Sequence, residues 1–482
     1  MKKNEKLQEA LGMVGGDLVE DAHAAPKRKA LPKRIKWAAA IAATLALFML
    51  AGTLRWLFPG TGAPQALSPF VLAYAAYPED EKAPNKSDYE NENEYFSAVS
   101  LWNSNRNAEI REFRSKGINI DEFTAITSPE MLAGSEGENA LYSPLNIYVM
   151  LAMLAEITGG ESRGQILALL GEESVEALRE KASALWNAAY KDNGVAKSLL
   201  SSSVWLSNSE KYNTETLQNL AKYYYASTFS GEMGSAEYNA ALQSWLNEGT
   251  KGLLSDRISE IEFDADTFMA LAATVYFSAP WENEFPVQKT QKGIFHSPSG
   301  DTEREFMNSD YSFGYYYRGE NFSAAYKSLE CSGSMYFILP DEGITPEELL
   351  GKEDFGDFLR GGGATDKKFM EISLSVPKFD VSSQSDLKSK LENLGVTDIF
   401  SDTTADFTPI TKKTIFASDV IHGVRVRIDE KSCEAASYAV VIMEATGAPS
   451  GEKINLVLDR PFIFLIKNEM GLPLFIGIVN NP

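Results

Sequence analysis

Few side chains in this chain could take part in catalysis. It has three histidines, His23, His296 and His422, and two cysteines, Cys331 and Cys433. A hydrolase needs a nucleophile, a base and an orienting group. The sequence has no His-Glu-x-x-His zinc motif, no phosphate-binding loop and no dinucleotide-binding glycine motif. It therefore predicts a protein that is not an enzyme and needs no cofactor or metal. A hydrolase with His296 or His422 as its base stays open as an alternative.

Residues 428–439 have the pattern of a strand that could enter an existing sheet. Successive side chains of a strand point to opposite faces. One face would carry only small side chains, which are those of Cys433, Ala435, Ser437 and Ala439. The other face would carry Glu434, Ala436, Tyr438 and Val440. Small side chains could pass over a packed core at little steric cost. An Ala-rich helix or an ordinary edge strand remains the alternative, and residues 444–452 read as an exposed loop because Gly and Pro interrupt them.

Short blocks elsewhere keep a fixed order along the chain. The first is Asn139-Ala-Leu-Tyr-Ser-Pro-Leu145, and the last is Pro461-Phe-Ile-Phe-Leu-Ile466 followed by Phe475-Ile-Gly-Ile-Val-Asn480 and Pro482. Between them lie the blocks 159–167, 274–285, 377–379, 394–400 and 418–422. These seven blocks, in this order, resemble the serpin family over roughly residues 106–482. The segment Glu430-Lys-Ser-Cys-Glu-Ala-Ala-Ser-Tyr-Ala439 resembles the hinge of that family.

The resemblance implies an α+β fold with a large mixed central β-sheet, additional sheets and about eight or nine helices. The residues agree with this class, because helical patterns cluster early in the chain and strand-like runs late. The serpin domain would span residues 106–482, with a reactive loop at about 430–456.

The resemblance also implies an inhibitor of serine proteases, and in some members of cysteine proteases. The protease becomes acylated to the loop, and the freed hinge then inserts into the central sheet. The implied hinge residues are Glu430, Ser432, Cys433, Glu434, Ala435, Ala436, Ser437, Tyr438 and Ala439. Ser432 replaces the usual glycine and Tyr438 is large for a hinge, so a non-inhibitory binding or adhesion module on the same scaffold remains the alternative.

The family's usual spacing from Glu430 places the cleaved bond at Thr446–Gly447, within a window from Ala445 to Ser450. All residues of this window are small and uncharged, and no Lys or Arg lies between Lys431 and Lys453. We therefore expect a target with a small S1 pocket, elastase-like or subtilisin-like, and not a trypsin-like one.

Three further residues match the region where the family's central sheet opens: Ser143, His422 and Trp281. The family usually has an asparagine where this chain has Ala273, so the familiar Asn–His hydrogen bond cannot form. A serine, a backbone group or water would then have to supply the hydrogen bond to His422. Without the family, His422 reads as a hydrogen-bonded core histidine and Trp281 as an anchoring core aromatic.

The composition limits the partners. The 482 residues carry 45 Lys and Arg against 67 Asp and Glu, a formal charge of −22. So acidic a chain disfavours nucleic acid as a partner. Two cysteines give no disulfide framework, and a bond at Cys433 would oppose hinge movement. We expect a monomer whose partner is a protease.

The N-terminal part predicts a membrane anchor. Residues 37–54 are uncharged, follow a basic cluster and could just span a bilayer as a helix. This pattern predicts a cytoplasmic tail over 1–36, a transmembrane anchor over 37–58, a solvated extracellular linker over 59–105 and an extracellular serpin domain on a bacterial cell surface. A secreted form, released after cleavage, is the alternative localisation.

Overall fold

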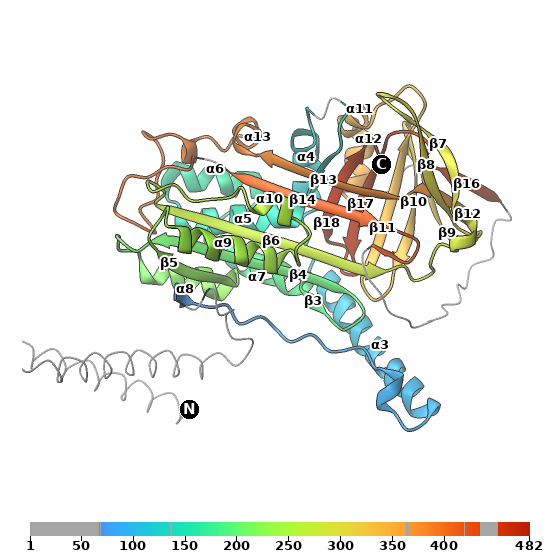
Figure 1. Cartoon of the computed structure of the whole chain (residues 1–482), viewed down its shortest axis with the longest axis horizontal. Coiled ribbons are helices and arrows are strands. Elements are labelled where there is room, and N and C mark those ends of the chain that lie inside the picture. Colours follow the sequence, from blue (N-terminus) through green and yellow to red (C-terminus); the bar gives the residue numbers. More distant parts are fainter. Residues whose placement is uncertain (1–66, 68, 135–136, 363–365, 419, 434–451) are drawn as a thin grey trace, which may run out of the picture. The chain divides into compact units, whose positions relative to one another are not determined.

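The computed structural model describes residue 67 and residues 69–134, 137–362, 366–418, 420–433 and 452–482 (Figure 1). These residues contain eleven α-helices, more than the eight or nine expected. The difference comes from helices of one or two turns, such as α10 and α11, which are too short to leave a clear sequence pattern. The helices are α3 (Glu92–Ser115), α4 (Asp121–Met131), α5 (Pro144–Ile157), α6 (Gly160–Leu170), α7 (Val175–Ala189), α8 (Thr214–Tyr223), α9 (Ala236–Gly249), α10 (Ser255–Ile258), α11 (Pro346–Leu350), α12 (Glu353–Leu359) and α13 (Lys388–Asn393).

The first sheet mixes parallel and antiparallel strands. Its order is β1 (Val71–Ala73), β5 (Ala226–Gly231), β4 (Lys197–Ser207), β6 (Met269–Pro280) and β15 (Ser432–Cys433), with β3 (Lys191–Asp192) beside β4. A separate two-stranded sheet joins β13 (Phe379–Asp386) to β14 (Ile421–Ile428). The expected central sheet is thus present in two pieces, because no pairing joins β6 to β14 among the described residues (Figure 1).

The largest sheet has ten strands. In order they are β2 (Ala140–Tyr142), β18 (Pro473–Val479), β17 (Phe462–Asn468), β11 (Gly333–Pro340), β10 (Phe322–Leu329), β9 (Ser312–Arg318), β12 (Asp366–Pro377), β8 (Gly300–Asn308) and β7 (Gln291–Ser297), with β16 (Lys453–Val457) beside β12. Both faces of β17 and β18 are buried, which explains the apolar run over 462–466 of β17 and the apolar sequence of β18.

Helix α5 lies at the centre of the main core. Ser143 caps its N-terminus, where its Oγ accepts a hydrogen bond from the backbone N–H of Asn146 over 3.3 Å, and Pro144 follows at the first helical position. Every residue of α5 except Met150 is buried. A helix that is apolar all round must be covered on all sides, and α5 contacts both β6 and β18.

Part of the range expected to be a solvated linker packs on the rest of the chain. β1 pairs antiparallel with β5, and the ring of Tyr77 stacks on Trp186 at a centroid distance of 5.2 Å. α3 begins at Glu92 and continues across the expected boundary at residue 105. β1 lies within the apolar run 70–77 of the expected linker, and its three residues are too few to show a strand's alternation.

No helix in the described part of the chain, which starts at residue 67, is long and apolar enough to cross a membrane. The expected anchor at 37–58 lies outside the described residues.

Candidate functional site

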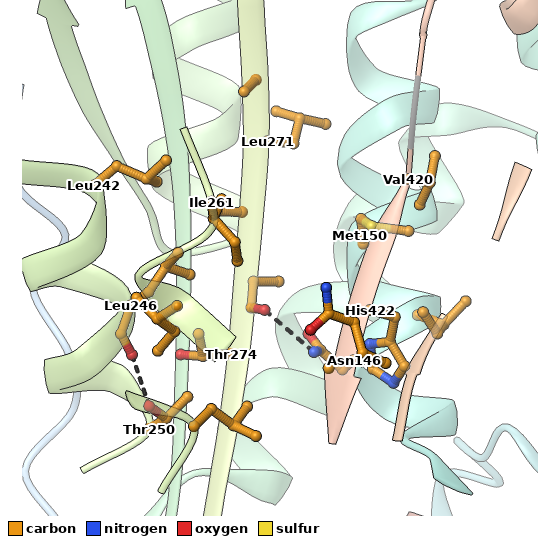
Figure 2. Close-up of a pocket in the computed structure, with 18 of the residues that line it drawn as sticks. Asn146, Met150, Leu242, Leu246, Thr250, Ile261, Leu271, Thr274, Val420 and His422 are labelled. Atoms are coloured by element: carbon orange, nitrogen blue, oxygen red, sulfur yellow. Dashed lines mark hydrogen bonds between the residues drawn. The ribbon is translucent and has the colours of Figure 1, made fainter. Parts of the chain in front are cut away.

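A cleft of about 610 Å³ lies between β6 and β14. Its walls come from several elements, among them α5, α9, β6 and β14, and Figure 2 shows side chains of these elements converging on it. The lining includes Asn146 and Met150 of α5, Leu242 and Leu246 of α9, Leu271 and Thr274 of β6, and Val420 and His422 at β14. The cleft is the space that one further strand would have to occupy to join the two pieces of the central sheet.

The N-terminal end of α5 makes hydrogen bonds to both walls of the cleft. The backbone N–H of Ser143 donates to Nε2 of His422 over 3.1 Å, and the Ser143 hydroxyl donates to the carbonyl of Leu474 over 2.6 Å. One turn along α5, Nδ2 of Asn146 donates to the carbonyl of Ala273 on β6 over 3.2 Å. α5 therefore holds β14 through its cap and β6 through Asn146.

The ring of His422 is neutral. Burial lowers the pKa of His422 to about 4, because the charged form would lose its hydration. Nε2 accepts a hydrogen bond, so the proton of the neutral ring is on Nδ1. The backbone N–H of Ser143 thus makes a hydrogen bond to His422 in this chain, which lacks the asparagine expected from the family resemblance.

The hinge begins beyond the C-terminal end of β14. The indole N–H of Trp281 donates to the carbonyl of Asp429 over 2.8 Å, and its backbone N–H donates to the carbonyl of Lys431 over 3.0 Å. Asp429 in turn accepts hydrogen bonds at Oδ1 from the backbone N–H groups of Lys431 and Ser432, both at 2.9 Å. These contacts hold a tight turn that reverses the chain from β14 into β15.

The side chain of Glu430, the first residue of the predicted hinge, is held by Lys378 and Thr290. Its carboxylate oxygen lies 2.8 Å from Nζ of Lys378 and accepts a hydrogen bond from the hydroxyl of Thr290 over 2.8 Å. Burial alone would raise the pKa of Glu430, but the hydrogen bonds from Lys378 and Thr290 outweigh it and lower the pKa below its usual range. Glu430 is therefore a paired anion and not the solvated charge that the sequence by itself would suggest.

The strand β15 enters the first sheet beside β6. Ser432 lies opposite Pro280, and Cys433 opposite Ala279, in an antiparallel register. Directly opposed residues share one face of a sheet. Ala279 and Cys433 both belong to the main core, whereas Ala270 of β6 packs against the second core cluster. Cys433 therefore points to the core side of the sheet.

The family model of serpins, described as serine protease inhibitors, matches residues 119–482. The chain belongs to the serpin family. It is 27% identical over 372 residues to Serpin-ZX of Arabidopsis thaliana, which covers 72% of this chain and 93% of that protein. It is 28% identical to human neuroserpin over 375 residues, or 73% and 88% of the two chains.

Solved structures agree with this assignment. The native state of the thermophilic serpin Tengpin matches this serpin with a TM-score of 0.66 and 26% identity, over 76% of this chain and 94% of that one. The latent state of the same protein matches with a TM-score of 0.62 and 25% identity, over 75% and 96%. Human thyroxine-binding globulin, at 20% identity and a TM-score of 0.63, shares the fold.

The structure brings together six of the residues singled out from the sequence of this serpin. Ser143 and His422 meet at the cleft, while Trp281 contacts the segment that holds Glu430, Ser432 and Cys433, where the sequence predicts the start of the hinge. The remaining hinge residues 434–439 and the bond Thr446–Gly447, with its window 445–450, lie outside the described residues.

Sequence reasoning missed three residues of the site: Asn146, Thr290 and Lys378. Each makes its contact with a segment more than 50 residues away in the chain, so no local pattern could reveal it. The one usable signal was the place of Lys378 inside the block 377–379, which already matched the family.

The sequence contains one Gly-x-Ser-x-Gly motif, Gly160 to Gly164, contrary to the expectation that no serine has this surrounding. A nucleophilic serine of that motif stands exposed on a strand-to-helix turn. Ser162 instead lies in the first turn of α6, is fully buried, and accepts a hydrogen bond from the backbone N–H of Asp406 over 3.0 Å. Ser162 is thus a structural residue of this serpin.

Neither Cys331 nor Cys433 forms a disulfide bond among the described residues. Burial raises the pKa of Cys331 to about 11, so the thiol is protonated at neutral pH. The described residues hold no cluster of three or more His, Cys, Asp or Glu side chains able to bind a metal ion.

Proposed function

We propose that this serpin inhibits serine proteases with a small S1 pocket, by inserting its cleaved loop between β6 and β14. The observation that carries the proposal is the register of β15 on β6. Continued along β6, it pairs Ala435 with Phe277, Ala439 with Ala273, and Met443 with Met269 at the far end of the strand. The residues on the core face would then be small from 433 to 439 and apolar at 441 and 443.

The cleft supports the proposal from the receiving side. It separates two strands that form no ladder with each other among the described residues, and its walls are largely apolar. An inserted strand would gain backbone hydrogen bonds on both edges. The hinge already makes the first two residue pairs with β6, so insertion would extend an existing ladder and would not need to start a new one.

The test is incubation of the full chain with elastase, subtilisin and trypsin, followed by denaturing gels. We expect a covalent serpin–protease band with elastase or subtilisin and none with trypsin, because the loop window lacks Lys and Arg. Clean cleavage without a covalent band would make the chain a substrate and refute the inhibitory function.

The alternative is a non-inhibitory module that binds a partner without inserting its loop. Thermal unfolding before and after a single cut in the loop separates the two. Insertion adds a central strand and should raise the unfolding temperature sharply, whereas a loop that stays outside should leave it unchanged.

We further propose that residues 37–58 anchor this serpin in a cell membrane, with residues 106–482 on the outer side. The uncharged run and the preceding basic cluster support this orientation. Resistance of the membrane-bound protein to alkaline carbonate extraction, with the domain accessible to added protease in intact cells, is the expected result. Release into the medium without residues 37–58 would favour the secreted form.

A further inference from the structure

Four aromatic side chains line up on an exposed face of the ten-stranded sheet. We call Tyr311, Phe313, Tyr315 and Phe369 the aromatic strip. Tyr311, Phe313 and Tyr315 are 44%, 49% and 38% exposed, and they alternate along the segment that leads into β9 and along β9 itself. Phe369 on β12 lies directly opposite Tyr315, so all four share one face.

The rings of the strip contact one another. Phe313 and Phe369 stack at a centroid distance of 5.9 Å and an angle of 18°, and Tyr315 meets Phe369 edge-on at 5.2 Å. These contacts hold the rings in place on a rigid sheet. A pre-organised aromatic surface loses little conformational entropy when a partner covers it.

A helix covers this face only beyond the strip. Tyr317, the next residue in the alternation, is 8% exposed because Phe358 of α12 packs against it at 5.6 Å. The opposite face of β12 is buried at Met370 and Ile372 and needs no further cover. Exposed aromatic clusters of this kind are typical of protein interfaces.

Two lysines border the strip. Nζ of Lys367 lies 4.1 Å from the ring centre of Tyr315, and Nζ of Lys453 lies 5.0 Å from that of Tyr311. Lys453 also pairs with Glu371 at 2.6 Å. No carboxylate of the described residues lies within ion-pairing distance of Lys367, so one positive charge at this border stays available on a chain of net charge −22.

We propose that the aromatic strip is a docking surface for the protease that attacks the reactive loop, an inference that rests on the proposed function. Lys453 is the first residue of β16, and β16 pairs in parallel with β12 from Glu371 onward (Figure 1). The loop thus returns to the sheet directly beside the strip.

Chain length places the protease over this surface. Gly447 is six residues from Lys453, and six residues span at most about 20 Å. A protease with the bond Thr446–Gly447 in its active site covers roughly 800 Å² of its partner in a standard interface. Its surface beside the active site would therefore meet the strip. The matching patch on the protease is apolar, with an acidic residue facing Lys367.

The experiment compares three full-length variants with the parent. Phe313→Thr/Tyr315→Thr removes two rings and keeps residues that favour strands. Phe96→Ala/Leu101→Ala is the matched control, since these side chains are 60% and 64% exposed on α3, away from the loop's return to the sheet. Lys367→Glu reverses the border charge without changing a ring.

Docking and trapping are measured separately. The enzyme is the protease with a small S1 pocket that the parent traps fastest. If the parent traps none, the enzyme is the one that cleaves the parent fastest. Affinity for that protease with its active-site serine replaced by alanine reports docking alone. The rate of covalent complex formation with the active protease reports docking and trapping together.

We expect the affinity of the double-Thr variant for the inactive protease to be about tenfold weaker or more. Lys367→Glu should slow association several-fold, more at low salt, and the control should match the parent.

Unchanged affinity of both strip variants for the inactive protease would overturn the proposal, even if the parent traps the active enzyme. Loss of affinity in the strip variants would support it even if the parent is only cleaved, a result that refutes trapping alone. If the parent binds no protease of the panel, both proposals fail. A parent that sediments as a dimer and a double-Thr variant that sediments as a monomer would assign the strip to self-association and overturn the docking proposal.

Discussion

The backbone N–H of Ser143 and the Nε2 atom of His422 lie 3.1 Å apart and join the start of α5 to β14. This bond crosses 279 positions of the chain and fixes one wall of the cleft to the central helix. It depends on a neutral ring, because a protonated His422 would turn Nε2 from an acceptor into a donor that faces another donor.

Stability should therefore fall as the solution is acidified through the range set by His422. The folded pKa is about 4 and the ordinary value is 6.5, so the unfolded state binds more protons between these limits. The free energy of unfolding contributed by this group is complete above pH 6.5 and declines as pH falls to about 4, by a total on the order of 3 kcal/mol.

Denaturant unfolding at pH 7 and pH 5 measures this effect against His422→Gln, which keeps an acceptor and cannot titrate. The parent should lose about 2 kcal/mol more than the variant between the two pH values. Identical losses would show that His422 is not held neutral by the fold.

The ion pair of Lys378 and Glu430 should stabilise the hinge beyond an ordinary surface pair. The side chains are only 30% and 12% exposed, and Thr290 adds a hydrogen bond. A double-mutant cycle with Lys378→Met and Glu430→Gln should give a coupling of about 1 kcal/mol in urea unfolding. The pair Lys292–Glu303, at 71% and 58% exposed, is the matched control and should couple more weakly. Equal coupling in both pairs would mean that Glu430 contributes nothing special to the hinge.

A charge on the core face of the hinge should turn an inhibitor into a substrate. If insertion continues the register of β15, it would put Ala435 on the core side, opposite Phe277, and Ala436 on the other side. Ala435→Glu would bury an unpaired charge on insertion, at a cost of several kcal/mol. Ala436→Glu changes the same residue type on the face that already carries Glu434. The ratio of trapped to cleaved protein on gels should collapse for the first variant and persist for the second. Equal trapping by both would show that the register does not continue.

Helix α9 packs closely against β6 at Gly249. A Cβ on Gly249 would lie 2.4 Å from Oγ1 of Thr274, a buried hydroxyl without a hydrogen-bond partner among the described residues. Gly249→Ala should destabilise the fold by about 1–3 kcal/mol through overpacking. Adding Thr274→Ala removes the clashing hydroxyl and should restore the unfolding temperature. A stabilised single variant would indicate that α9 stands clear of β6.

The helical patterns that cluster early in the sequence correspond to the helices α5 to α8, which are ten to fifteen residues long. The sequence underestimated the short helices α10, α11 and α13, whose four to six residues carry no period. It also predicted a linker over residues 59–105, since a three-residue strand such as β1 shows no alternation and the polar composition around Trp102 does not reveal that its ring is buried.

Local order along the chain was enough to indicate the family and to predict which hinge residues would share a face, because motif spacing and strand alternation are properties of consecutive residues. Tertiary structure alone decided that β6 and β14 stand apart, that Ser143 takes the place of an absent asparagine, and that Lys378 and Thr290 hold Glu430. These contacts join residues more than 40 positions apart, and their energy depends on burial and orientation that only the packed chain creates.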